Sequence, residues 1–137
     1  MMRASTAEAL GLEPGARIAS HGAHAQDPAR FTTAPGPAMR KALARAGWQA
    51  GDVDLFEINE AFAVVAMAAQ RDLGIPREKL NVNGGACALG HPIGATGARL
   101  IVTLLHALEA HDAKRGIAAL CIGGGEATAI AVERAVH

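Results

Sequence analysis

The chain has 137 residues, enough for one compact domain, and half of them are apolar although only 3% are aromatic. Its 13 basic and 13 acidic residues cancel without forming a block of like charge, which argues against nucleic acid or an anionic membrane surface as a partner. Two cysteines, no secretory signal and no unbroken apolar run of membrane-spanning length favour a soluble protein of a reducing, cytoplasmic compartment.

The first part of the chain has the pattern of a helix, a strand, a loop and a second helix. A helix over residues 1–10 would be capped by Ser5, with Glu8 three positions later. A short strand is expected over residues 16–20, before a polar loop. The next helix, over residues 37–46, has Pro at its first position, apolar side chains on one face and Gly after its last residue.

The rest of the chain alternates strands with helices. The expected elements are a strand over 53–58, a largely buried helix over 60–73, a strand over 80–83, a helix over 95–110, and strands over 117–122 and 127–133. The last two strands are separated by three glycines and are expected to run antiparallel. The alternation predicts an α/β layered domain with a mostly parallel mixed sheet.

Function in such a sheet is expected at the carboxyl ends of the strands, where three polar loops follow. The most informative residue there is His91, which lies between Gly90 and Pro92 in a loop rich in glycine. Histidine can exchange a proton near neutral pH, and clustered glycines indicate special backbone angles or a close approach. The alternative is a histidine at the surface or at a helix cap. The other five histidines have no comparable setting.

Three further residues each have a structural and a chemical interpretation. Cys121 ends an apolar strand, so it is either a small buried hydrophobe or an acid/base or nucleophilic thiol beside an oxyanion hole. Asn59 either caps a helix that begins at Glu60 or acts as a catalytic amide. Cys87 lies among alanines, which favours packing. No paired ligand motif accompanies Cys87 and His91, and no phosphate-loop pattern is present, so neither a metal site nor a nucleotide site is expected.

Taken in order, the three loops resemble the signature segments of the thiolase family. The matching segments are Asn-Glu-Ala-Phe at 59–62, Asn-x-Asn-Gly-Gly-x-x-x-x-Gly-His-Pro-x-Gly-x-x-Gly-x-Arg at 81–99, and Cys-x-Gly-Gly-Gly at 121–125. The middle block is long and matches at every specified position. The resemblance extends over residues 7–133, nearly the whole chain.

The resemblance implies a role for each of four site residues. Thiolases transfer acyl groups between coenzyme A thioesters through an acyl-cysteine. His91 would take the proton of that cysteine and help to hold the thioester oxygen, while Cys121 would be the second acid/base, acting at the α-carbon of acetyl-CoA. Asn59 would hold a water for the enolate oxygen, and the backbone N–H of Gly123 would contribute to an oxyanion hole. These roles fit the need for a base and for enolate stabilisation.

The same resemblance implies the fold, the partners and the setting. Residues 1–137 would be a thiolase C-terminal domain, part of a layered α/β sandwich, incomplete at its N-terminal edge and lacking the N-terminal half. Phe31 and Phe62 match positions that line the acyl pocket. Acetyl-CoA and acetoacetyl-CoA would be substrates rather than cofactors. The complete enzyme would be a cytoplasmic homo-oligomer, a dimer or tetramer, in fatty acid metabolism.

The sequence departs from the family pattern in two places, and only the first limits what this chain is expected to do. Neither Cys87 nor Cys121 has the sequence context of the acyl-accepting cysteine, which would lie in the N-terminal half, so the isolated chain is expected to be inactive. Glu126 and the two residues after it stand where many members have Gln or Met followed by Gly, a difference that leaves the catalytic roles intact.

Two other classes of function remain possible from the sequence. The chain could be a non-catalytic binding or complementation module that pairs with a separate N-terminal half. It could also be a non-catalytic lipid-carrier relative, which the intact Gly-His-Pro and Cys-x-Gly motifs disfavour. The apolar faces expected on the helices over 60–73 and 95–110 would be covered by the other half, so we expect the isolated chain to be poorly soluble.

Overall fold

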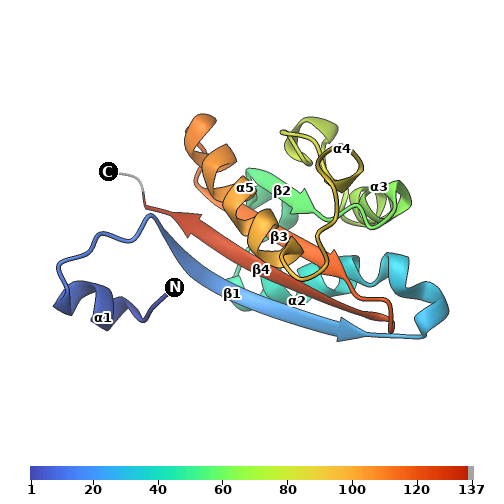
Figure 1. Cartoon of the computed structure of the whole chain (residues 1–137), viewed down its shortest axis with the longest axis horizontal. Coiled ribbons are helices and arrows are strands. Elements are labelled where there is room, and N and C mark those ends of the chain that lie inside the picture. The colour runs from blue at the N-terminus through green and yellow to red at the C-terminus, as the bar shows by residue number, and fades with distance from the viewer. Residues whose placement is uncertain (136–137) are drawn as a thin grey trace.

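Four segments rich in Ala, Val, Leu and Ile pair into one mixed sheet at the centre of the chain. The computed structural model describes residues 1–135, and Figure 1 shows the sheet with its helices. In spatial order the strands are β1 (Ala16–Ala25), β4 (Glu126–Arg134), β3 (Arg115–Cys121) and β2 (Leu55–Ile58). The α/β class with a mixed sheet is therefore as the sequence predicts.

The expectation of a mostly parallel sheet is wrong. Only β2 and β3 are parallel, with Leu55 opposite Gly116 and Ile58 opposite Ala119. The β3–β4 and β1–β4 pairings are antiparallel. The expected strand over 80–83 does not form, so it adds no second parallel pair, and β1 lies beside the antiparallel strand β4. The short connection after Cys121 makes β3 and β4 antiparallel, as expected, because a tight turn can join only antiparallel neighbours.

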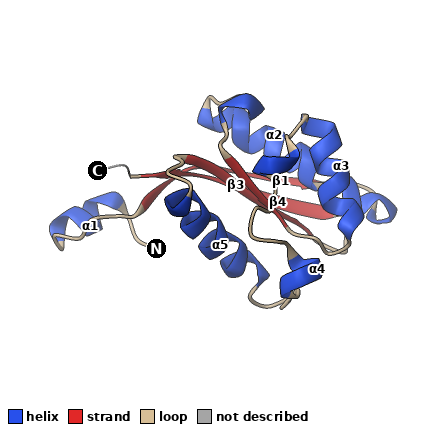
Figure 2. Cartoon of the chain, turned by 90° about the horizontal axis from the view of Figure 1, so that it is seen from above, coloured by secondary structure: helices blue, strands red, loops and turns tan. Residues whose placement is uncertain are grey.

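Helices cover both faces of the sheet. They are α1 (Ala4–Ala9), α2 (Pro35–Ala46), α3 (Ala63–Leu73), α4 (Ala86–Leu89) and α5 (Thr96–Ala110). Figure 2 shows α2 and α3 on one side of the sheet and α5 on the other, with α1 standing at one end. Among residues 1–135, no helix has both the length and the apolar character that crossing a membrane would require.

Each face of the sheet has its own apolar core. On the α5 side, Leu100, Leu104 and Leu108 recur every four residues and pack against Leu55 and Val132. On the other side, α2 and α3 contribute small side chains that let the helices lie close to the strands. The fully buried members there include Ala38, Met39, Ala42 and Val65.

Several helices and strands in the first part of the chain begin or end at other residues than expected. Ser5 is inside α1, which begins one residue earlier, and no side chain caps that helix. The strand expected over 16–20 continues to Ala25, because β4 supplies pairing partners along that length. The loop that follows contains a 3₁₀ helix, Pro28–Thr33, and α2 begins two residues earlier than expected.

The region that leads into the site also differs from expectation. Residues 80–83 form no strand, only one bridge between Leu80 and Phe56, because Asn81 takes a φ of 48° that a strand cannot continue. The helix α4 inside the Gly-rich loop was not expected. The helix α3 begins at Ala63 rather than at residue 60, and it is not largely buried.

Candidate functional site

The parallel pair β2–β3 brings two of the expected site segments to one edge of the sheet. Both strands end there: Asn59 directly follows β2, and Cys121 is the last residue of β3. The backbone N–H of Asn59 donates to the carbonyl of Ala119, 2.9 Å away, which extends the ladder by one residue. Asn59 is completely buried, and Cys121 is also buried. A polar amide and a thiol thus share one end of the core.

Asn81 anchors the Gly-rich loop to this edge. Its side-chain Oδ1 accepts from the backbone N–H of Ile58 at 2.8 Å, and its Nδ2 donates to the carbonyl of the same residue at 2.9 Å. The amide therefore replaces the backbone of a neighbouring strand. Glu60, which was expected in the first turn of a helix, lies before α3 and accepts from the backbone N–H of Cys87 at 3.0 Å.

The loop places His91 beside Asn59. His91 Nε2 lies 3.3 Å from Asn59 Nδ2, and its Nδ1 lies 2.6 Å from the hydroxyl of Thr96, the first residue of α5. The Thr96 hydroxyl donates its proton to the carbonyl of Pro92 at 2.9 Å, so toward His91 it accepts. The hydrogen bonds therefore assign the ring proton to Nδ1 and leave the Nε2 lone pair facing Asn59.

A buried ion pair adjoins the same amide. Arg99 Nη1 lies 2.7 Å from Glu57 Oε1, and Arg99 Nη2 lies 3.4 Å from Asn59 Oδ1. Burial raises the pKa of Glu57 to about 7, against the opposing hydrogen bond and charge of Arg99. Glu57, Arg99, Asn59, His91 and Thr96 form one continuous set of contacts.

Cys121 and Gly123 lie at the same strand ends but are not bonded to that set. Burial raises the pKa of the Cys121 thiol, so the thiol is protonated at neutral pH. Within residues 1–135, no hydrogen bond joins it to His91 or Asn59. The turn after β3 is closed by the N–H of Gly125, which donates to the carbonyl of Ile122 at 3.0 Å. Gly123 is exposed, and its N–H has no acceptor among the described residues.

The two expected pocket aromatics are neighbours. Phe31 and Phe62 meet edge to face, with 6.2 Å between ring centroids and 64° between ring planes. Phe62 stays 61% exposed at the start of α3, so its ring is available to another surface. Thr96, Arg99, Glu57 and Asn81 take part in the site although no role was expected for them from the sequence. One feature of the sequence could have indicated this part of the site. Glu57 is an acidic residue inside an apolar strand, and a buried acid needs a buried polar partner.

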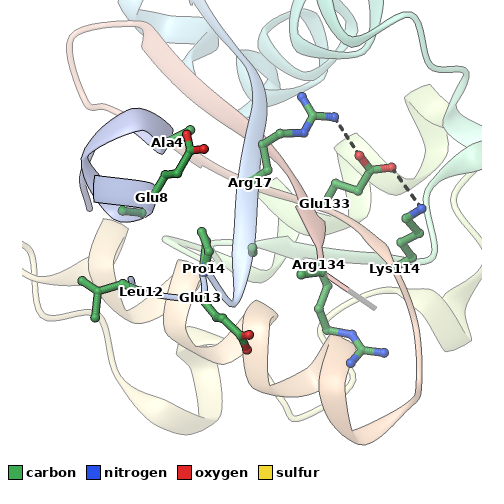
Figure 3. A pocket seen from close by; sticks show the side chains of 12 residues that line it. Ala4, Glu8, Leu12, Glu13, Pro14, Arg17, Lys114, Glu133 and Arg134 are labelled. Carbon is green, nitrogen blue, oxygen red and sulfur yellow. Dashed lines mark hydrogen bonds and ion pairs between the residues drawn. The ribbon is translucent and has the colours of Figure 1, made fainter. Parts of the chain in front are cut away.

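A hollow lies at the opposite end of the sheet, between α1 and the outer ends of β1 and β4. Figure 3 shows its charged lining, where Glu133 meets Arg17 at 2.7 Å and Lys114 at 3.8 Å. None of the expected site residues lines it. Among residues 1–135, no three His, Cys, Asp or Glu side chains gather as a group that could hold a metal ion.

Comparison with known proteins gives a consistent set of relatives. The family model described as "Thiolase, C-terminal domain" matches residues 12–134. Acetyl-CoA acetyltransferases from Allochromatium vinosum and Escherichia coli K12 are 53% and 54% identical over 134 residues. The crystal structure of the Bacillus anthracis acetyl-CoA acetyltransferase superposes with a TM-score of 0.94 at 45% identity. Each of these three proteins matches 98% of this chain over 34% of its own length, so the chain spans about a third of the length of these relatives.

Proposed function

The chain belongs to the thiolase family, and on that premise we propose that it is the C-terminal part of an acetyl-CoA C-acetyltransferase. The complete enzyme would carry out thiolysis of 3-oxoacyl-CoA and the reverse Claisen condensation of acetyl-CoA. The observation that carries the proposal is the 3.3 Å approach of His91 and Asn59 at the strand end that Cys121 also occupies. A base, an amide and a thiol at one edge match the needs of proton transfer beside a thioester.

Four residues have proposed roles, and the local chemistry supports those of His91 and Cys121 most directly. His91 is the base for the acyl-accepting cysteine, since its Nε2 carries a lone pair in the tautomer set by Thr96. Cys121 is the acid/base at the α-carbon, and its raised pKa keeps it protonated as an acid at neutral pH. Asn59 holds the water that completes one oxyanion site. The exposed N–H of Gly123 serves the other.

The acyl-accepting cysteine is proposed to lie in the part of the thiolase that these 137 residues do not include. Cys121 is buried and protonated, which suits proton transfer better than acyl transfer. Cys87 is exposed, but a hydrogen bond to the Glu60 carboxylate raises the pKa of its thiol and disfavours the thiolate. We therefore expect the isolated chain to be inactive.

Membership of the thiolase family is also the basis for the proposed substrates, oligomeric state and cellular location. Acetyl-CoA and acetoacetyl-CoA are proposed as substrates, with no further cofactor. Phe31 and Phe62, already in contact, would line the acyl pocket. The complete enzyme would be a homo-oligomer, a dimer or tetramer, working in fatty acid metabolism in the cytoplasm.

A second candidate is a non-catalytic module that pairs with a separate N-terminal half. The apolar residues exposed on α3, on α5 and near the site favour a chain that docks onto another surface. The most exposed of these are Ile93, Met67, Phe62 and Val102. Under this proposal, pairing would occur without turnover.

The test is complementation with the N-terminal two-thirds of the Allochromatium vinosum relative. The chain alone should not cleave acetoacetyl-CoA, whereas the co-purified pair should. Replacing His91 with Ala in the pair should lower kcat by about 100-fold or more, because a general base is lost. The matched control is the exposed His111, whose change to Ala should leave kcat unaltered.

Each outcome of this experiment contradicts a particular part of the proposal. Cleavage by the chain alone would show that the acyl-accepting residue is present in it. A stable but inactive pair would favour the non-catalytic module. An active pair that is indifferent to His91→Ala would remove the proposed base.

A further inference from the structure

The Asn59 amide is held in one of its two possible orientations. A side-chain amide can be turned over with little change of shape, which exchanges a donor for an acceptor. Arg99 carries only donors, so the oxygen of Asn59 must face Arg99 Nη2, 3.4 Å away. The amide nitrogen then faces His91 Nε2 at 3.3 Å. The guanidinium therefore decides which atom of Asn59 is turned to the imidazole.

The guanidinium is itself held by a second buried group. Glu57 Oε1 accepts from Arg99 Nη1 at 2.7 Å, with the carboxylate side chain 2% exposed and the guanidinium side chain 17% exposed. Glu57 lies two residues before Asn59, so both side chains point to the same face of the sheet. Arg99 lies in the first turn of α5, which packs on that face. Strand and helix thus meet through these three polar side chains.

Stability alone is a poor explanation for this arrangement. Burying an ion pair removes two charges from water, and apolar residues of the same size often serve a core equally well. Arg99 Nε is also buried without an acceptor among residues 1–135, a further cost. The arrangement is better explained by the two contacts that the guanidinium makes. Nη1 binds Glu57, and Nη2 binds the amide oxygen of Asn59.

We propose that Arg99, anchored by Glu57, is a positioning residue that fixes the orientation of the Asn59 amide and so of the hydrogen bond between Asn59 and His91. The proposal rests on the thiolase function proposed above. It assigns no contact with substrate to Arg99 or Glu57. Both act through Asn59.

The first test replaces Arg99 with Gln in the reconstituted enzyme. We expect kcat for thiolysis to fall by ~10- to 100-fold, with KM within about twofold, because a misoriented amide affects the reaction more than binding. Arg99→Lys should recover only part of the loss, since one ammonium cannot replace both arms of the fork. The matched control is Arg40→Gln, which breaks a surface pair with Asp72 and should leave kcat unchanged.

A double-mutant cycle tests whether Arg99 acts through Asn59. In an Asn59→Ala background, Arg99→Gln should lower kcat by less than about twofold, because the amide that it orients is gone. An equal loss in both backgrounds would overturn the proposal. A kcat that Arg99→Gln leaves unchanged in the otherwise native, folded enzyme would overturn it as well.

A readout that does not need turnover separates this proposal from the proposed function. Nitrogen NMR of isotope-labelled histidine in the paired chain, at mildly alkaline pH, reports the tautomer of His91. We expect the proton on Nδ1 in the native chain and in Arg40→Gln, and a mixture of tautomers in Arg99→Gln. If the native pair is inactive, the proposed function fails, while this spectrum still decides the role of Arg99.

An unchanged His91 spectrum in Arg99→Gln would overturn the positioning role, whatever the activity. If Arg99→Gln does not fold, Arg99→Lys and Glu57→Gln are measured in its place. Both keep a polar group of similar size at the buried position. Glu57→Gln should shift the tautomer in the same direction, since it releases the anchor of Arg99.

Discussion

Asn59, His91 and Cys121 each have a structural and a chemical interpretation, and their individual contacts bear on that choice to different degrees. Asn59 does not cap a helix, because α3 begins four residues later and the amide faces His91 instead. His91 caps no helix, since no side chain caps α5, but its residue is exposed, as the surface interpretation expects. What distinguishes it from an ordinary surface histidine is that both ring nitrogens have partners, Nδ1 at the Thr96 hydroxyl and Nε2 at the Asn59 amide. Cys121 is buried, as a small hydrophobe would be, so burial alone leaves both of its interpretations open.

The two cysteines should differ strongly in reactivity. Cys87 is exposed and Cys121 is buried, so Ellman's reagent should modify one thiol in the folded chain and the second on unfolding. We expect the second reaction to be slower on the order of 100-fold or more, because it requires local opening. Glu60→Gln should accelerate the first reaction, because removing the carboxylate lowers the pKa of Cys87.

The control for this prediction is Cys87→Ser, which should abolish the fast reaction and leave the slow one. Two fast thiols in the native chain would contradict the burial of Cys121. A slower first reaction in Glu60→Gln would contradict the effect of the carboxylate on Cys87.

At the scale of the elements, the fold depends on close approaches that only small residues allow. Gly22 of β1 lies against α2, where a Cβ would clash with the backbone carbonyl of Ala38 and lie 2.8 Å from the backbone nitrogen of Ala42. Gly116 of β3 lies under Leu104 of α5 in a similar way, with the leucine Cδ1 2.8 Å from the place of a Cβ. The abundance of Ala and Gly in this chain therefore sets how closely its helices approach the sheet.

Gly22→Ala should destabilise the chain by at least about 2 kcal/mol, because the clash is with backbone that cannot rotate away. The measurement is urea unfolding followed by circular dichroism. Gly51→Ala is the matched control, since a Cβ there meets nothing within 4 Å, and its unfolding midpoint should stay near that of the native chain. Equal midpoints for both variants would show that β1 and α2 do not pack as described.

At the scale of the whole molecule, the described chain leaves apolar side chains uncovered on its helical faces. Val64 and Met67 lie one turn apart on α3 and are 52% and 64% exposed. They line a shallow hollow with Arg71 and Asp72. On the other side of the sheet, Val102 of α5 is 55% exposed. Such surfaces favour association with another chain or with another part of the same protein.

The isolated chain should therefore self-associate. Its mean mass by light scattering should rise with concentration, because contact between exposed apolar faces removes them from water. A Val64→Ser, Met67→Ser double variant should shift the distribution toward the monomer without loss of helical signal, since neither side chain is in the core. A sharp, monodisperse monomer of the native chain would contradict the prediction.

The sequence by itself determined the family and the α/β class, because these follow from motif order and from periodicity along the chain. It also named the residues on which the proposed chemistry depends, and their roles stay predictions. It also predicted α2 and its Gly47 terminus, and the antiparallel hairpin of β3 and β4. These features are local, so neighbouring residues are sufficient to specify them.

Only the tertiary structure decided how the sheet is assembled and which residues surround the site. The pairing of β1 with β4 joins residues more than a hundred positions apart, and no local pattern specifies it. The contacts of Asn59 with Arg99, and of Asn81 with Ile58, likewise depend on strands and helices that meet only after folding. Burial on both faces of the sheet then makes each of those polar contacts necessary, because an unpaired polar group inside the core would be costly.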